Sequence, residues 1–152
     1  MKPLIAITAA ELDAEPSARV WALVQYLATH AAARRDPALR PFWLAYSYDA
    51  EVLNGGHLQY FHNHGTGCVA ETLDALRAIG AHGHAAVLEE CRAQAERSPV
   101  ARVDSLGAYA SLAAEGPFAA QDAAYHDEAP PVMQRLESHH AALLAAAVAV
   151  RG

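Results

Sequence analysis

Residues 51–65 carry the densest set of side chains that could do chemistry. One carboxylate, Glu51, is followed by three side-chain amides, with three histidines among them. Carboxylates and imidazoles can act as general acids and bases, and both can bind divalent metal ions. Amides donate and accept hydrogen bonds, so the segment could form a polar pocket, form a contact surface or hold a turn together. The amides are Asn54, Gln59 and Asn63, and the histidines are His57, His62 and His64.

The spacing of the histidines does not favour a metal centre on a helix. His62 and His64 are two residues apart, as are His82 and His84, and rings at that spacing point to different sides of a helix. The sequence contains neither H-E-x-x-H nor C-x-x-C. We therefore expect surface histidines on turns and no metal or other cofactor, with His57, His62 and His64 as the candidate ligands should a metal bind.

An enzymatic function rests on the same few residues. The sequence contains no G-x-S-x-G, no phosphate-binding loop and no G-x-G-x-x-G. Glu51, beside His57, Asn54 and Gln59, could perform general acid–base chemistry, but a simpler role is to bond nearby backbone or to pair with an arginine. Enzymatic activity is therefore the alternative: a small hydrolase-like or metal-binding protein that uses Glu51 with His57, His62 and His64.

Two adjacent glycines, Gly55 and Gly56, must position this segment. They follow an aromatic-rich stretch predicted to be a helix over residues 41–54, and they predict a sharp reversal after it. One glycine can take a positive φ, and the other lets a second part of the chain come close.

The residues after the glycines predict a short helical turn over residues 58–62. Gln59 and Asn63 are four apart and would share one face of such a turn, while Tyr60 and Phe61 supply apolar anchors. We expect the amides of Asn54, Gln59 and Asn63 to join the two helices at this turn, with a polar pocket as the other interpretation.

Composition predicts an all-α fold. The chain has 37 alanines in 152 residues, and alanine is the best helix former. Residues 1–152 are expected to form a single compact domain of about six helices, with residues 1–12 as a lead-in segment that is extended around residues 4–8. Apolar spacing, glycines and prolines predict the longer helices over residues 16–33, 41–54, 68–79, 84–96, 99–116 and 131–150.

Charge and hydrophobicity exclude several classes of protein. A hydrophobic content of 53% excludes a disordered chain, and no apolar run reaches the roughly 18 residues that cross a membrane. Eleven basic against 17 acidic residues give a net charge of -6, which argues against direct binding to nucleic acid. Cys68 and Cys91 are expected to be reduced core thiols, and without a convincing signal peptide we expect a cytoplasmic protein.

The segment around the glycines resembles the signature E-V-x-N-G-G-F-x-Q-Y-F-x-N-x-x-G of the DNA mimic protein 19 family. The resemblance extends over residues 43–81, where the stretch 75–81 is similar to the family's A-L-x-x-I-G-A. The chain departs from the pattern at His57, where the family has Phe, at Leu53, where Asn is common, and at His64, which replaces a small polar residue. The residues carried over are Glu51, Asn54, Gly55, Gly56, Gln59, Tyr60, Phe61, Asn63 and Gly65.

This resemblance implies a mostly helical, often dimeric domain that presents acidic side chains, arranged like DNA phosphates, to a transcription factor. We therefore expect a non-enzymatic interaction domain that binds a protein partner, such as a DNA-binding protein, through an acidic face, and that forms a homodimer. The chain carries interspersed arginines that would interrupt such a face. The candidate carboxylates are Glu11, Asp13, Glu15, Asp49, Glu89, Glu90, Glu96, Asp122, Asp127, Glu128 and Glu137.

Overall fold

A computed structural model describes residues 2–152 and confirms the all-α prediction. Within these residues the chain forms nine α-helices, one 3₁₀ helix and a single pair of short strands. The elements in chain order are β1 (Ile5–Thr8), α1 (Ala9–Ala14), α2 (Ala18–Thr29), the 3₁₀ helix (Ala33–Arg35), α3 (Arg40–His64), α4 (Val69–Ala78), α5 (His82–Arg97), α6 (Leu106–Ala114), α7 (Ala119–Asp127), α8 (Val132–His139), α9 (Ala141–Ala147) and β2 (Val148–Arg151).

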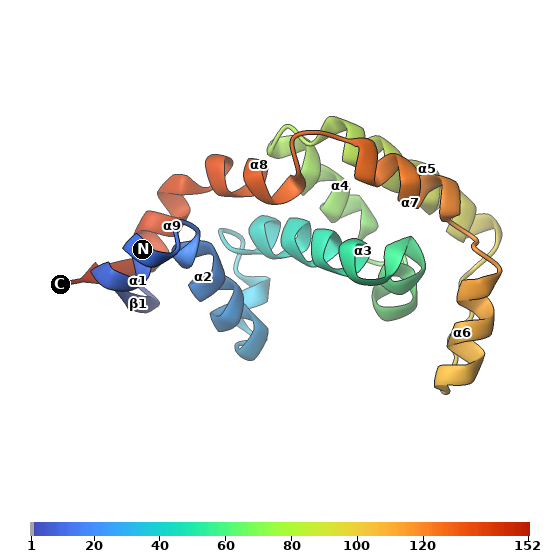
Figure 1. The fold of residues 1–152 in the computed structure, drawn as a ribbon, viewed down its shortest axis with the longest axis horizontal. Coiled ribbons are helices and arrows are strands. Elements are labelled where there is room, and N and C mark those ends of the chain that lie inside the picture. Colours follow the sequence, from blue (N-terminus) through green and yellow to red (C-terminus); the bar gives the residue numbers. More distant parts are fainter. Residues whose placement is uncertain (1) are drawn as a thin grey trace.

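Helix α3 runs lengthways through the middle of the molecule, and α4, α7 and α8 pack against it (Figure 1). Its side chains Phe42, Ala45, Tyr48 and Val52 are buried, at the spacing that keeps one face of a helix turned inward. Leu76 of α4 and leucines of α2, α5 and α8 join the same apolar core. This central helix also carries the Glu51–Gly65 segment, so the core fixes the position of that segment.

Helices α5 and α7 lie side by side and antiparallel, at the upper right of Figure 1. The side-chain amide of Gln94, late in α5, donates to the carbonyl of Pro117, just before α7. At the other end, Glu128 follows α7 and its carboxylate lies against Gly83 of α5. The solvent-facing sides of α5 and α7 therefore lie next to each other.

Strands β1 and β2 form a parallel pair that brings residues near the two ends of the chain together (Figure 1). Ile5 pairs with Val148 and Thr8 with Arg151. The expected extension of residues 4–8 is therefore correct, but a short helix follows it at once. Thr8 caps this helix, α1: its hydroxyl accepts from the Glu11 N–H, and the Glu11 carboxylate accepts from the Thr8 N–H.

Several predicted helices are shorter or divided. The helix expected over 99–116 is confined to α6, which buries no residue and leaves Leu106 86% exposed. The helix expected over 131–150 breaks at His140 into α8 and α9 and ends in β2, because Val148–Arg151 bond to β1 instead. Among the described helices, none combines the length and the apolar character needed to span a bilayer.

Candidate functional site

The two glycines divide α3 into two helical halves. Gly55 has φ -155° and ψ 23°, and Gly56 has φ 70° and ψ -176°. The prediction that one glycine takes a positive φ is confirmed, and that residue is Gly56. A Cβ on Gly55 would run into the side chain of Gln59, and one on Gly56 would lie 2.5 Å from Oδ2 of Asp122. A side chain at Gly55 would displace Gln59, and one at Gly56 would displace Asp122 and also meet an unfavourable backbone conformation.

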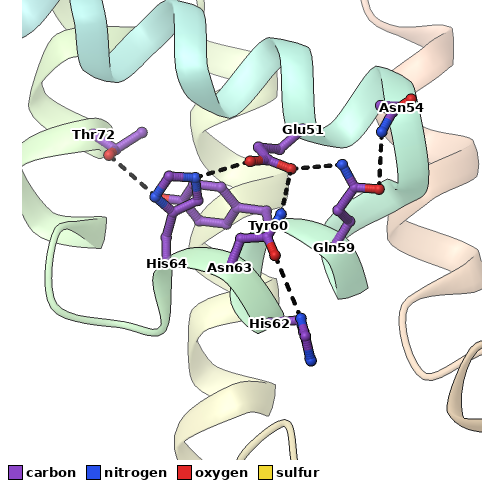
Figure 2. A network of polar contacts seen from close by, with 8 residues as sticks. All are labelled: Glu51, Asn54, Gln59, Tyr60, His62, Asn63, His64 and Thr72. Atoms are coloured by element: carbon purple, nitrogen blue, oxygen red, sulfur yellow. Dashed lines mark hydrogen bonds and ion pairs between the residues drawn. The ribbon is translucent and has the colours of Figure 1, made fainter. Parts of the chain in front are cut away.

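Glu51 is the centre of the polar contacts across this kink (Figure 2). Its Oε2 accepts from Nε2 of Gln59 at 2.6 Å and from Nδ2 of Asn63 at 2.9 Å. Its Oε1 lies 3.1 Å from Nε2 of His64. Nδ2 of Asn54 donates to Oε1 of Gln59 at 3.1 Å. One carboxylate from the first half of α3 thus collects three donors from the second half.

The amides were expected to join two helices at this turn, and they lie across it. They bond to Glu51 and to one another. The Glu51 side chain is only 21% exposed, and its two oxygens already accept from up to three donors. A carboxylate held in this way stabilises the kink.

His57 is completely buried, so the expectation of a surface histidine is wrong for this residue. Its Nδ1 lies 2.6 Å from Oδ1 of Asp122, and the same oxygen accepts from the His57 backbone N–H at 2.8 Å. Its Nε2 lies 2.8 Å from the Tyr48 hydroxyl. The ring stands where the family signature has Phe, with Phe118 and Tyr125 beside it, which explains its burial.

The surroundings of His57 favour the neutral form of its ring. Burial lowers the pKa of its imidazole, although Asp122 acts in the opposite direction. A neutral ring that donates from Nδ1 to the Asp122 carboxylate accepts the Tyr48 O–H at Nε2. Tyr48 is also fully buried, whereas the Asp122 side chain is 32% exposed. The Asp122–His57–Tyr48 chain links α7 to both halves of α3.

A second buried pair lies close by. The Tyr125 hydroxyl of α7 donates to Asp49 of α3, and the ring of His84 from α5 meets Tyr125 edge to face at 4.8 Å. Burial raises the pKa of both Asp49 and Tyr125, and it lowers that of His84. Sequence reasoning missed Tyr125 and His84 because their partners are distant in the chain, and it missed Tyr48, nine residues before His57, because no motif marks it.

The histidines of the motif point to different partners. His64 meets Glu51, His57 meets Asp122, and Nε2 of His62 lies 3.3 Å from the carbonyl oxygen and 3.4 Å from the backbone nitrogen of Val103. Within residues 2–152 no three His, Cys, Asp or Glu side chains gather as ligands for a metal ion. Of the residues named for the enzymatic and metal-binding alternative, only Glu51 and His64 are in contact.

An open groove of about 320 Å³ runs beside the Glu51 network. Residues of both halves of α3 form its walls, including two of the three motif amides and the rings of Trp43 and Tyr46. The residues are Trp43, Tyr46, Ser47, Ala50, Glu51, Asn54, Gln59 and His64. The motif therefore has a solvent-facing edge in addition to its role at the kink.

The candidate acidic residues fall into two sets and three exceptions. Glu11, Asp13 and Glu15 lie on or just after α1, near the chain ends, whereas Glu89, Glu90, Glu96, Asp127 and Glu128 lie on or just after α5 and α7, towards the opposite end (Figure 1). The prediction of surface carboxylates is wrong for Asp49, which is buried, whereas Asp122 is partly exposed and bonds to His57. Glu137 lies on α8 and accepts from the Ser17 hydroxyl at 2.9 Å.

Arginines neutralise part of the second set. Glu89 pairs with Arg92 and Arg77, and Glu96 lies 3.7 Å from Nε of Arg92. Glu90, Asp127 and Glu128 form no ion pair within the described part of the chain. Within the second set, these three carboxylates are the ones most available to a partner.

The comparisons with known proteins give one match. A family model described as DMP19-like protein matches residues 34–149, which include all of α3 and the α5–α7 pair. No curated protein and no solved structure matches the chain.

Proposed function

The chain belongs to the DMP19-like protein family, and from that membership we propose that it is a non-enzymatic domain that binds a DNA-binding protein. The contact surface would be the acidic face, defined here as Glu89, Glu90, Glu96, Asp127 and Glu128 on the α5–α7 pair. Carboxylates that compete with DNA phosphates must lie close together on one surface, because a DNA-binding site is built to neutralise several phosphates at once.

The observation that carries this proposal is the antiparallel packing of α5 and α7. It brings carboxylates from residues 89–96 and 127–128 onto adjacent helices, although more than thirty residues separate them in sequence. Residues 82–97 and 119–128 together contain six carboxylates and two arginines. Asp122 lies on the inner side, against His57, which leaves the other five carboxylates for the outer surfaces.

The arrangement of the motif supports the same conclusion. Its carboxylate and amides bond to one another across the kink, and its buried histidine bonds to Asp122 and Tyr48. These groups stabilise α3 and its contact with α7, and the partner would be bound by the exposed helices outside them.

Membership of the family also leads us to propose that the chain forms a homodimer. Sedimentation velocity would measure this self-association directly.

A competition experiment tests the proposal. The tagged chain is mixed with a nuclease-treated lysate of its source cells, and bound proteins are eluted with duplex DNA. We expect a DNA-binding protein to be captured and then released by the DNA, because both ligands would occupy the same basic site. If duplex DNA does not release the captured protein, the proposal is contradicted.

Matched charge variants locate the surface. The triple change Glu90→Gln, Asp127→Asn and Glu128→Gln removes three carboxylates that form no ion pair, and it should abolish capture. The control Glu11→Gln, Asp13→Asn and Glu15→Gln makes the same charge change on α1, and Gln can still serve the α1 cap. If the two triple variants capture the partner equally well, the acidic face is not the binding surface.

A further inference from the structure

A hollow rich in arginine lies between the 3₁₀ helix, α3 and the start of α4. Its volume is about 260 Å³. No carboxylate forms its wall, although the chain as a whole carries a net charge of -6. The wall residues are Ala31, Arg34, Arg35, Arg40, Trp43, Leu44, Ser47, Tyr60, His64, Cys68 and Thr72.

Arg34 is fixed by neutral groups. Its Nε donates to the carbonyl of Leu27 at 2.5 Å, and its Nη2 donates to the carbonyl of Ala28. The guanidinium lies 4.7 Å from the centroid of the Trp43 ring. These contacts hold the side chain in place at the end of α2 but leave its positive charge without a carboxylate.

The other two arginines differ in their partners. Arg40 forms a two-pronged ion pair with Glu71 of α4, in which Nη2 and Oε1 are 2.7 Å apart. Arg35 is exposed, and its side chain makes no hydrogen bond or ion pair with residues 2–152. Within the described residues, Arg40 is the only one of the three arginines in an ion pair, so the charges of Arg34 and Arg35 are not directly paired.

Neutral groups complete the wall. The Ser47 hydroxyl is shielded from solvent and has no hydrogen-bond partner within residues 2–152, which is unusual for a buried polar atom. The hydroxyls of Tyr60 and Thr72 lie 3.3 Å apart. Trp43 and Leu44 add apolar surface. The hollow also lies at the N-terminal end of α4, which favours negative charge.

We propose that this hollow binds a small organic anion: a carboxylate that carries a flat apolar group. The planar guanidinium of Arg35 would bind the carboxylate, with the charge of Arg34 beside it, since an arginine fork matches both oxygens of a carboxylate. The apolar group would lie against Trp43 and Leu44. The volume is below the range typical of drug-sized ligands, so the ligand is correspondingly small. This site is separate from the acidic face.

Titration followed by NMR tests the site, with benzoate as the probe and neutral benzamide as its matched control. The chain has two tryptophans, so the Trp21→Phe variant assigns the indole signal of Trp43. We expect a saturable shift of the Trp43 signal with benzoate that weakens as salt is added, and no such shift with benzamide. Benzoate should also slow alkylation of Cys68 by iodoacetamide, because that thiol lies in the wall.

A pair of arginine variants completes the test. Arg35→Gln should weaken benzoate binding roughly fivefold or more, whereas Arg97→Gln, the same charge change at an exposed position on α5, should leave it unchanged. Equal shifts with benzamide, equal affinity in the two variants, or displacement of benzoate by an equal concentration of inorganic phosphate would each overturn the proposal.

Discussion

Gly56 shows how one backbone conformation organises the centre of the molecule. Its positive φ with extended ψ is a combination that essentially only glycine adopts. The missing side chain leaves room for the Asp122 carboxylate, which accepts from the backbone and the ring of His57. The glycine therefore allows α7 to attach to the kink of α3 through a charged hydrogen-bond acceptor.

Replacing Gly56 by Ala should lower the free energy of unfolding by about 2 to 4 kcal/mol, because the backbone is strained and Asp122 must move. Urea denaturation measures this value. The control Gly65→Ala has a similar backbone conformation, with φ 63°, but no atom within 4 Å of the added Cβ, so it should cost only about 1 to 2 kcal/mol. Equal costs for the two variants would show that the contact with Asp122 contributes nothing.

The burial of His57 could not be predicted from its neighbours in the sequence. A histidine that follows two glycines usually lies on the surface of a turn, and here the burial depends on Asp122 and Tyr48. Asp122 is 65 residues away, on a helix whose position the sequence does not specify. The glycine break itself was predictable, because it depends only on local backbone preference.

At the level of elements, α3 is two helices that meet at the glycines and are held by Glu51. The first half supplies the carboxylate, and the second half supplies the donors Gln59, Asn63 and His64. Without this carboxylate, the two amide donors would lose their strongest acceptor. The network therefore fixes the angle at which the second half leaves the first.

Glu51→Ala should destabilise the protein by about 1 to 3 kcal/mol, the cost of leaving several donors without their charged acceptor. Thermal unfolding followed by circular dichroism measures the change. Glu90→Ala, on an exposed surface of α5, is the matched control and should change stability by about 0.5 kcal/mol or less. An unchanged melting temperature for Glu51→Ala would mean that the network does not hold the kink.

The sequence predicted the longer helices better than their ends. Apolar spacing and Gly80, which has φ 75°, placed α4 and α5 within two residues at either end. The break at His140 and the extended residues 148–151 were missed. The alanine-rich composition of residues 131–150 predicts one continuous helix. Tertiary pairing with residues 5–8 overrides this preference.

At the scale of the whole molecule, two buried histidines and the half-buried His140 make stability depend on pH. Burial lowers the pKa of His57 and of His84, and it lowers the pKa of His140 to about 4. In the unfolded chain each imidazole takes up a proton near pH 6.5, whereas in the folded chain it does so only at lower pH. The unfolded state therefore binds more protons than the folded state below about pH 6.5. As a result, the free energy of unfolding decreases as the pH is lowered. The raised pKa of Asp49 acts in the opposite direction.

Removing one of these histidines should reduce this dependence. For His140→Gln, the loss of unfolding free energy between pH 7 and pH 5 should be smaller than in the unchanged chain by about 1 to 2 kcal/mol. Urea denaturation at the two pH values gives the difference. His82→Gln, at an exposed position, should retain the full loss. The same pH dependence in both variants would contradict a role for the half-buried His140 ring.

The parallel β1–β2 pair has a mechanical consequence. Tension applied at residue 4 and residue 152 would pull the start of β1 and the end of β2 in opposite directions along the strands. In a parallel pair this load is shear, so the hydrogen bonds between residues 5–8 and 148–151 bear the force together instead of opening one after another. The helices would therefore bear little of the applied force until the hydrogen bonds between β1 and β2 break.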